Sequence, residues 1–76
     1  MTADIIEFEQ AYQIESVIDN NFSLRLLEMG CSKGTEIIKV LEAPFGDPIA
    51  YVIGSSFVLA LRRCEAQSII VTKKFG

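Results

Sequence analysis

The sequence contains no histidine and no tryptophan, and only two cysteines among its 76 residues. Without histidine, the chain lacks the side chain that most often moves protons near neutral pH and that most often binds metals. It also lacks a glycine-rich phosphate loop and a pair of carboxylates whose spacing would force them together. These absences argue against an enzyme.

Long apolar runs are also missing. No stretch approaches the roughly 18 residues that a membrane-spanning helix needs, and residues 1–20 contain no basic segment of the kind that begins a secretory signal. We therefore expect a cytoplasmic protein that does not insert into a membrane. In that compartment Cys31 and Cys64 should be reduced thiols.

Positive charge is scarce. Seven Lys and Arg face ten Asp and Glu, for a net charge of −3, and the first 20 residues hold five acidic residues and no basic one. Proteins that bind nucleic acids gather Lys and Arg into a patch that replaces the counterions of the phosphates. This balance argues against a nucleic-acid partner.

Half of the residues are hydrophobic, enough for the core of one small domain over residues 1–76. Alternating and β-branched segments predict five strands, at 12–18, 36–42, 49–53, 57–62 and 69–71. A short helix is expected at 22–30 and one helical turn at 63–68. Residues 1–11 read as an arm or an edge strand, and residues 73–76 as a polar tail. The pattern predicts a mainly β fold, a small, partly open SH3-like barrel.

The predicted helix should begin at a cap formed by Asn21 or Ser23 and end at Gly30. Its buried face is expected to centre on Leu24 and Leu27, and Leu26 and Phe22 should widen that face. In the first strand, Tyr12, Ile14 and Ser16 should share one side. We expect Tyr51 and Phe57 in the core.

Two places suggest chemistry. Cys31 and Cys64 could meet in space and, with a carboxylate, bind Fe(II) or Zn(II), but structural zinc sites usually need four nitrogen or sulfur ligands. Ordinary half-buried cysteines are the simpler interpretation, and no cofactor is predicted. Phe45, between Pro44 and Gly46 at a loop tip, should be at least partly exposed; it is either an anchor for a partner or a loop side chain folded back over the barrel.

The charged residues near that loop have simpler roles. We expect Asp47 to accept hydrogen bonds from the backbone of its own turn. Arg62 and Arg63 should point to opposite sides, so that one pairs with a carboxylate and the other stays free.

Four blocks of sequence resemble the ferrous iron transport protein A (FeoA) family. They are Arg25 to Gly30, Gly34 to Glu36, Ala43 to Pro48, and Leu59 to Arg63 with Glu65 and Ala66, which stand in the family's order over about residues 22–71. The block Ala-Pro-Phe-Gly-Asp-Pro is the most specific. Lys33 stands where the family often has proline, and the connection before Phe57 is longer than usual.

The resemblance implies an SH3-like fold and a small cytosolic accessory of bacterial ferrous iron uptake. It also implies a partner, the membrane ferrous iron transporter FeoB, through its cytosolic part. From exposure we predict a contact surface made of two parts, the loop residues Pro44, Phe45, Gly46 and Asp47, and the helix residues Arg25 and Glu28. Two other hypotheses stay open: a metal-sensing module that uses Cys31 and Cys64, and a homo-oligomer formed through free strand edges.

Overall fold

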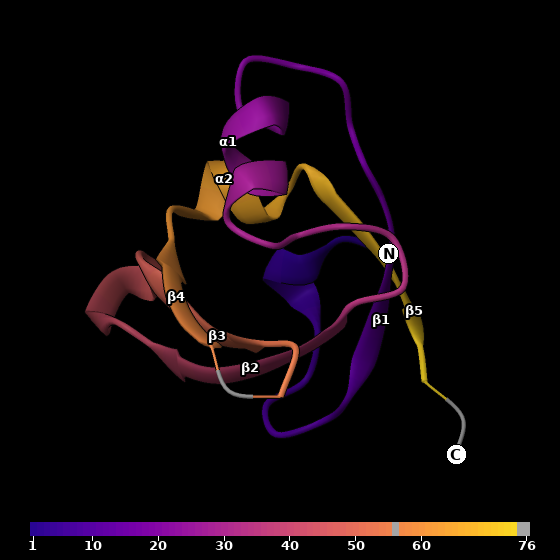
Figure 1. Ribbon diagram of the computed structural model, residues 1–76. Coiled ribbons are helices and arrows are strands. Elements are labelled where there is room, and N and C mark those ends of the chain that lie inside the picture. Colours follow the sequence, from indigo (N-terminus) through magenta and orange to yellow (C-terminus); the bar gives the residue numbers. More distant parts are fainter. Residues whose placement is uncertain (56, 75–76) are drawn as a thin grey trace.

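The computed structural model describes residues 1–55 and 57–74, which form one curved sheet with short helices at one end (Figure 1). Five strands are present in these residues, as the sequence predicts. The elements in chain order are η1 (Ala3–Ile5), β1 (Tyr12–Val17), α1 (Ser23–Glu28), β2 (Glu36–Glu42), η2 (Pro44–Gly46), β3 (Ile49–Ile53), β4 (Phe57–Leu61), α2 (Arg63–Ala66) and β5 (Ile69–Lys73). None of the described helices is long and apolar enough to cross a membrane.

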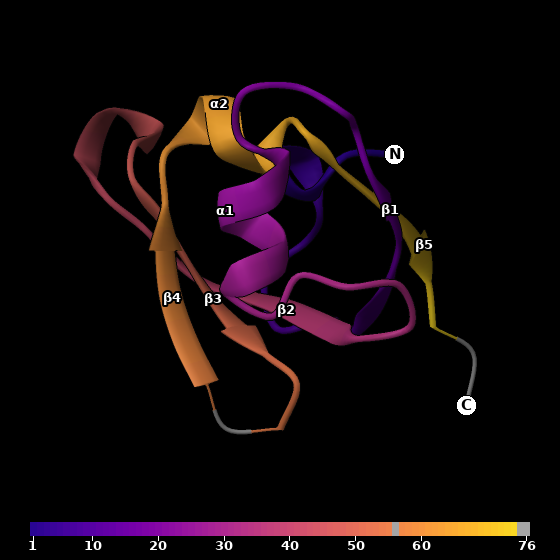
Figure 2. The same cartoon turned by 45° about the horizontal axis from the view of Figure 1, so that its top comes forward.

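The strands are antiparallel in the order β4-β3-β2-β1-β5. The sheet curls toward a barrel but does not close, because β4 and β5 are its two outer strands and do not pair with each other. The helix α2 joins these two strands, and α1 lies over the same end of the sheet, as Figure 2 shows from another side. The predicted partly open barrel is confirmed.

The core lies on the concave side of this sheet. In β3 the predicted alternation is confirmed, since Ile49, Tyr51 and Ile53 are buried and the residues between them are not. The Tyr51 hydroxyl donates a hydrogen bond to the carbonyl oxygen of Ala3, 2.8 Å away, so its polar end is satisfied. The buried core residues are Ala3, Ile6, Tyr12, Ile14, Leu26, Cys31, Ile37, Ile49, Tyr51, Ile53, Leu61, Ala66, Ile69 and Val71.

The first strand departs from simple alternation. A bulge between Ile14 and Ser16 shifts the pairing of β1 with β5. Because β1 has one residue more than β5 at the bulge, the side chains that follow on β1 point to the opposite faces of the sheet from those that simple alternation predicts. Val17 therefore packs against the core and Ser16 is exposed, so the expectation that Ser16 shares the side of Tyr12 and Ile14 is wrong.

The helix α1 buries a narrower face than predicted. Leu26 is completely buried, whereas Leu24 is 70% exposed and Leu27 is also exposed, so the expected face centred on these two leucines is wrong. Leu26 is the buried residue of this short helix, and Phe22 and Met29 at its two ends are partly buried against the core, so the expected contribution of Leu26 and Phe22 is confirmed. The predicted end is confirmed, because Gly30 has a positive φ of 97° and the Cys31 N–H bonds to the Leu26 carbonyl.

The start of α1 also differs from the prediction. Neither Asn21 nor Ser23 caps it through a side chain, and Phe22 occupies the cap position without a side-chain bond. Instead the Asn20 side-chain oxygen accepts a hydrogen bond from the Phe22 N–H at 2.8 Å. The turn before the helix is thus held by a residue one position earlier than expected.

Residues 1–11 form an arm that contains one turn of 3-10 helix, and they pair with the sheet only through two isolated bridges, at Thr2 and Phe8. The arm runs along the outer edge of β5, where the Val71 N–H donates to the Met1 carbonyl at 2.8 Å. It also passes β2, where the buried Lys39 donates from Nζ to the Asp4 carbonyl at 2.8 Å.

At the C-terminal end and in the β3–β4 connection, the structure differs from the predicted element boundaries by a few residues. The last strand continues to Lys73, beyond the predicted end at Val71, and Lys74 pairs with Glu36 at 2.7 Å. Gly54 and Ser55 lie in the expected turn, while Ser56 and the last two residues of the predicted tail fall outside the described residues. Phe57 is 56% exposed, so its placement in the core is wrong.

The two leucines of α1 provide a test of this packing. We expect Leu26→Ala to lower the free energy of unfolding by about 2–5 kcal/mol, the usual cost of truncating a buried leucine. Leu24→Ala should change it by less than about 0.5 kcal/mol. Urea denaturation of both variants measures the difference, and equal effects would contradict the buried position of Leu26.

Candidate functional site

The loop between β2 and β3 presents an aromatic side chain to solvent. Phe45 is fully exposed, as predicted, and its backbone is in the left-handed region at φ 74°. Few residues other than glycine, asparagine and aspartate adopt this conformation, and it is uncommon for a bulky side chain. Such strain persists only where the surrounding structure imposes it, and it concentrates at functional sites.

Arg63, the first residue of α2, imposes the shape of the loop. Its Nε donates to the Gly46 carbonyl at 3.0 Å, and a terminal nitrogen of the same guanidinium pairs with Glu42 at the end of β2. The other terminal nitrogen lies 3.7 Å from the Asp4 carboxylate. A Cβ on residue 46 would approach this guanidinium to 3.1 Å, which explains the glycine after Phe45.

Asp47 acts across the structure rather than within its own turn. Its Oδ1 accepts a hydrogen bond from the Arg63 backbone N–H at 3.0 Å. That N–H is one of those at the start of a helix that have no partner within the helix. The predicted bonds to its own turn are not found in the described residues, so this prediction is wrong.

The two neighbouring arginines divide as the sequence suggests. The Arg63 side chain is 32% exposed and is bound on several sides, whereas the Arg62 side chain is 68% exposed and only approaches Asp47, at 4.0 Å. Arg63 is therefore the structural arginine.

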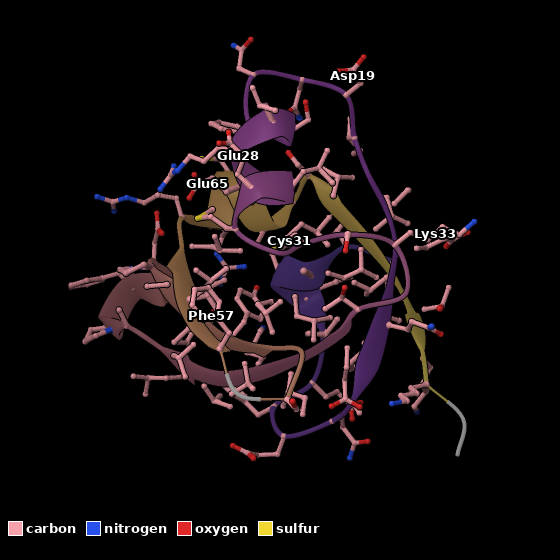
Figure 3. All side chains as sticks on the ribbon, in the orientation of Figure 1. Asp19, Glu28, Cys31, Lys33, Phe57 and Glu65 are labelled. Atoms are coloured by element: carbon pink, nitrogen blue, oxygen red, sulfur yellow. The ribbon has the colours of Figure 1, made fainter. Side chains whose placement is uncertain are left out.

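On the other side of α2, Arg25 of α1 pairs with Glu65, whose side chain is nearly buried. Glu65 also accepts a hydrogen bond from the Arg62 N–H at 2.9 Å, so it joins the start of α2 to α1. Glu28 is exposed on α1, at the helical end of the molecule (Figure 3). Arg25 and the Phe45 loop thus flank α2 and are both fixed to it.

Sequence reasoning did not find this pairing of Glu65. One signal was available, because a glutamate three residues after the residue that precedes a helix commonly bonds back to that residue's N–H. The pairing of Arg63 with Glu42 and Asp4 carries no such signal, since these residues belong to separate segments of the chain.

The two cysteines do not form a metal site with other described residues. Cys31 is buried beneath α1 and Cys64 is exposed on α2, and both are free thiols. Burial raises the pKa of the Cys31 thiol from its ordinary 9.0 to about 11, which disfavours the thiolate that a metal would need. Within residues 1–55 and 57–74, no three cysteine, aspartate or glutamate side chains gather as a ligand set.

Comparison with protein families gives a direct result. The FeoA domain model matches residues 1–73. The chain belongs to the FeoA family. The resemblance inferred from the sequence blocks is therefore confirmed, and it extends over the N-terminal arm as well as the residues that carry the blocks.

Solved structures agree with this FeoA assignment. The iron(II) transport protein A of Clostridium thermocellum is 30% identical with a TM-score of 0.87, over 96% of this chain and 45% of that one. This chain thus spans less than half of that protein. An FeoA-like protein of Clostridium acetobutylicum is 27% identical with a TM-score of 0.88, over 100% of this chain and 88% of that one.

A third FeoA structure, from Stenotrophomonas maltophilia, was determined with zinc and is described as a prokaryotic SH3 domain protein and a candidate activating factor of ferrous iron transport. It is 29% identical with a TM-score of 0.81, over 93% of this chain and 88% of that one. The predicted SH3-like fold is thus confirmed for this FeoA domain. No match was found among curated proteins.

The neighbouring arginines Arg62 and Arg63 form a matched pair for mutation. Arg63→Ala should lower the free energy of unfolding by about 3 kcal/mol, because it leaves the partly buried Asp4 and Glu42 without their counterion. Arg62→Ala should cost less than about 1 kcal/mol, as expected for an exposed ion pair. Thermal and urea denaturation measure both, and a larger loss in Arg62→Ala would contradict this assignment.

Because the Cys31 thiol is buried, we expect the free energy of unfolding to fall at alkaline pH. Its pKa is higher in the folded chain than in the unfolded one, so its contribution is complete below pH 9 and is lost as the pH rises toward 11. The loss amounts to roughly 2–3 kcal/mol. Urea denaturation from pH 8 to 11 should show a shallower decline in Cys31→Ala than in Cys64→Ala. Parallel declines would refute the assignment.

Proposed function

We propose that this FeoA domain is a cytosolic accessory of bacterial ferrous iron uptake that docks on the membrane transporter FeoB and modulates it. Family membership supports the link to iron transport, and the Stenotrophomonas relative is described as a candidate activating factor. The role is one of binding and needs no catalytic group. The observation that carries it is Phe45, a fully exposed aromatic side chain held in a strained backbone conformation.

An aromatic side chain of this kind is suited to anchor a complex. A few aromatic and arginine residues supply most of the affinity of protein interfaces. Fixing the anchor before binding lowers the entropy lost on association. Arg63 and Asp47 fix the Phe45 loop to α2, so the backbone that carries the ring is held in one place.

The helical part of the predicted surface has a different character. Arg25 is bound to the buried Glu65, so a charge reversal at Arg25 would set two negative charges together and damage the fold. Arg25 is therefore unsuited to a docking test. Glu28, exposed on the same helix, remains a candidate contact in addition to the loop.

Phe45→Asn separates docking from folding. Asparagine tolerates the left-handed conformation, so we expect the free energy of unfolding to stay equal or to rise by up to about 1 kcal/mol. The apolar anchor is lost, so the affinity for FeoB should fall by about 30-fold, as for a residue that contributes 2 kcal/mol. Ile18→Ala removes an exposed apolar side chain elsewhere and should bind as the wild type does.

The measurement is binding of the labelled chain to full-length FeoB in nanodiscs and, separately, to its soluble GTP-binding domain. Binding to both places the contact on the GTP-binding domain, and binding to the nanodiscs alone places it on the rest of the transporter. Wild-type affinity in Phe45→Asn would refute the loop as the anchor. Absence of binding to either form would refute the proposed function.

A further inference from the structure

The chain covers one edge of its sheet and leaves the other edge open. The outer edge of β5 is lined by the N-terminal arm, through the bridge between Thr2 and Ile70 and the bonds between Met1 and Val71. The outer edge of β4 has no such cover: β3 is the sole strand that pairs with it among the described residues. An uncovered edge presents backbone N–H and C=O groups that can pair with another strand.

The strand β4 also lacks the features that normally protect an edge. Proteins keep edge strands from pairing with charged side chains, proline, bulges or very short length. The five residues of β4, Phe-Val-Leu-Ala-Leu, include no charged residue and no proline. Their pairing with β3 is regular from Phe57 to Leu61, without a bulge.

The convex face of the sheet beside this edge is apolar as well. Antiparallel sheets usually turn a polar face to water. Here Val58 is 64% exposed, and its cross-strand neighbours on β3 and β2 are Val52 and Ile38. The next row of cross-strand neighbours on this convex face consists of Ala60 on β4, Ala50 on β3 and Leu41 on β2. An exposed apolar face of this kind marks an interaction surface.

The concave side of β4 is incomplete in the same way. Phe57 lies on the side of Leu59 and Leu61, and of these three only Leu61 is fully buried. A further strand beside β4 would cover the open flank of Phe57.

We propose that the occupant of this edge is β4 of a second copy of the chain, paired antiparallel about a two-fold axis at Leu59. This register pairs all five residues, with Phe57 opposite Leu61, Val58 opposite Ala60, and Leu59 opposite itself. Every pair is apolar. The paired segment contains no charged residue, so no like charges face each other within it.

The resulting dimer carries a continuous sheet across two chains, and the apolar convex face extends across the axis. One short strand pair buries a small area, which places this dimer among weak, concentration-dependent complexes. Each chain has a net charge of −3, so moderate salt should strengthen the association. The proposal concerns the chain alone and does not depend on docking to the transporter.

Analytical ultracentrifugation of the purified chain over a concentration series tests the proposal. The average mass should rise from 8.4 kDa toward twice that value as the concentration increases to about the millimolar range. A mass that stays at 8.4 kDa throughout would overturn the proposal.

Two charge variants then locate the interface. In Val58→Lys/Ala60→Lys the two-fold axis sets lysine against lysine, and in Val58→Glu/Ala60→Glu it sets glutamate against glutamate. Each variant alone should weaken self-association more than tenfold. An equal mixture should form a heterodimer, because each lysine then faces a glutamate, and this recovery shows that both variants are folded. Lack of recovery would refute the proposed register.

Leu41→Lys is the matched control. It places a lysine on the same apolar face but two strands away from the β4 edge. Edge pairing predicts wild-type self-association in this variant. Loss of the dimer in Leu41→Lys as well would show that the two copies pack face to face, and it would overturn pairing through β4.

Discussion

The guanidinium of Arg63 is the interaction on which most of this small structure depends. It binds the carboxylate of Glu42, the carbonyl of Gly46 and the arm at Asp4, so one side chain connects β2, the Phe45 loop, α2 and the N-terminal segment. A domain of this size buries too little apolar surface to fix every loop by packing alone. A charged group with five donors in a rigid fork can hold several segments at once.

A second ion pair completes the helical end of the molecule. Glu65, 2% exposed, joins the start of α2 to Arg25 of α1, so that the two short helices support each other above the open end of the sheet. Helices of one or two turns are not stable alone. Because both helices are tied down, the strained Phe45 is presented by a rigid frame rather than by a free loop, which suits a residue that anchors a partner.

The two edges of the sheet have different roles: one is covered and contributes to stability, and the other is open to interaction. The N-terminal arm forms hydrogen bonds along the outer edge of β5, and its Ala3 and Ile6 are part of the core. The β4 edge is left open beside an apolar convex face and an incompletely covered Phe57. Covering every edge would favour a monomer, whereas one open edge allows pairing without disturbing the helical end that holds Phe45.

The sequence alone determined the five strands, the stop of α1 at Gly30 and the exposure of Phe45, because alternation, glycine and proline act over a few neighbouring residues. Its blocks also determined the family. Only the tertiary structure decided that Leu26 rather than Leu24 is buried, that Asp47 bonds to α2, and which carboxylates surround Arg63. A bulge, a helix orientation and an ion pair between distant segments depend on how the elements pack, and local pattern carries no record of that packing.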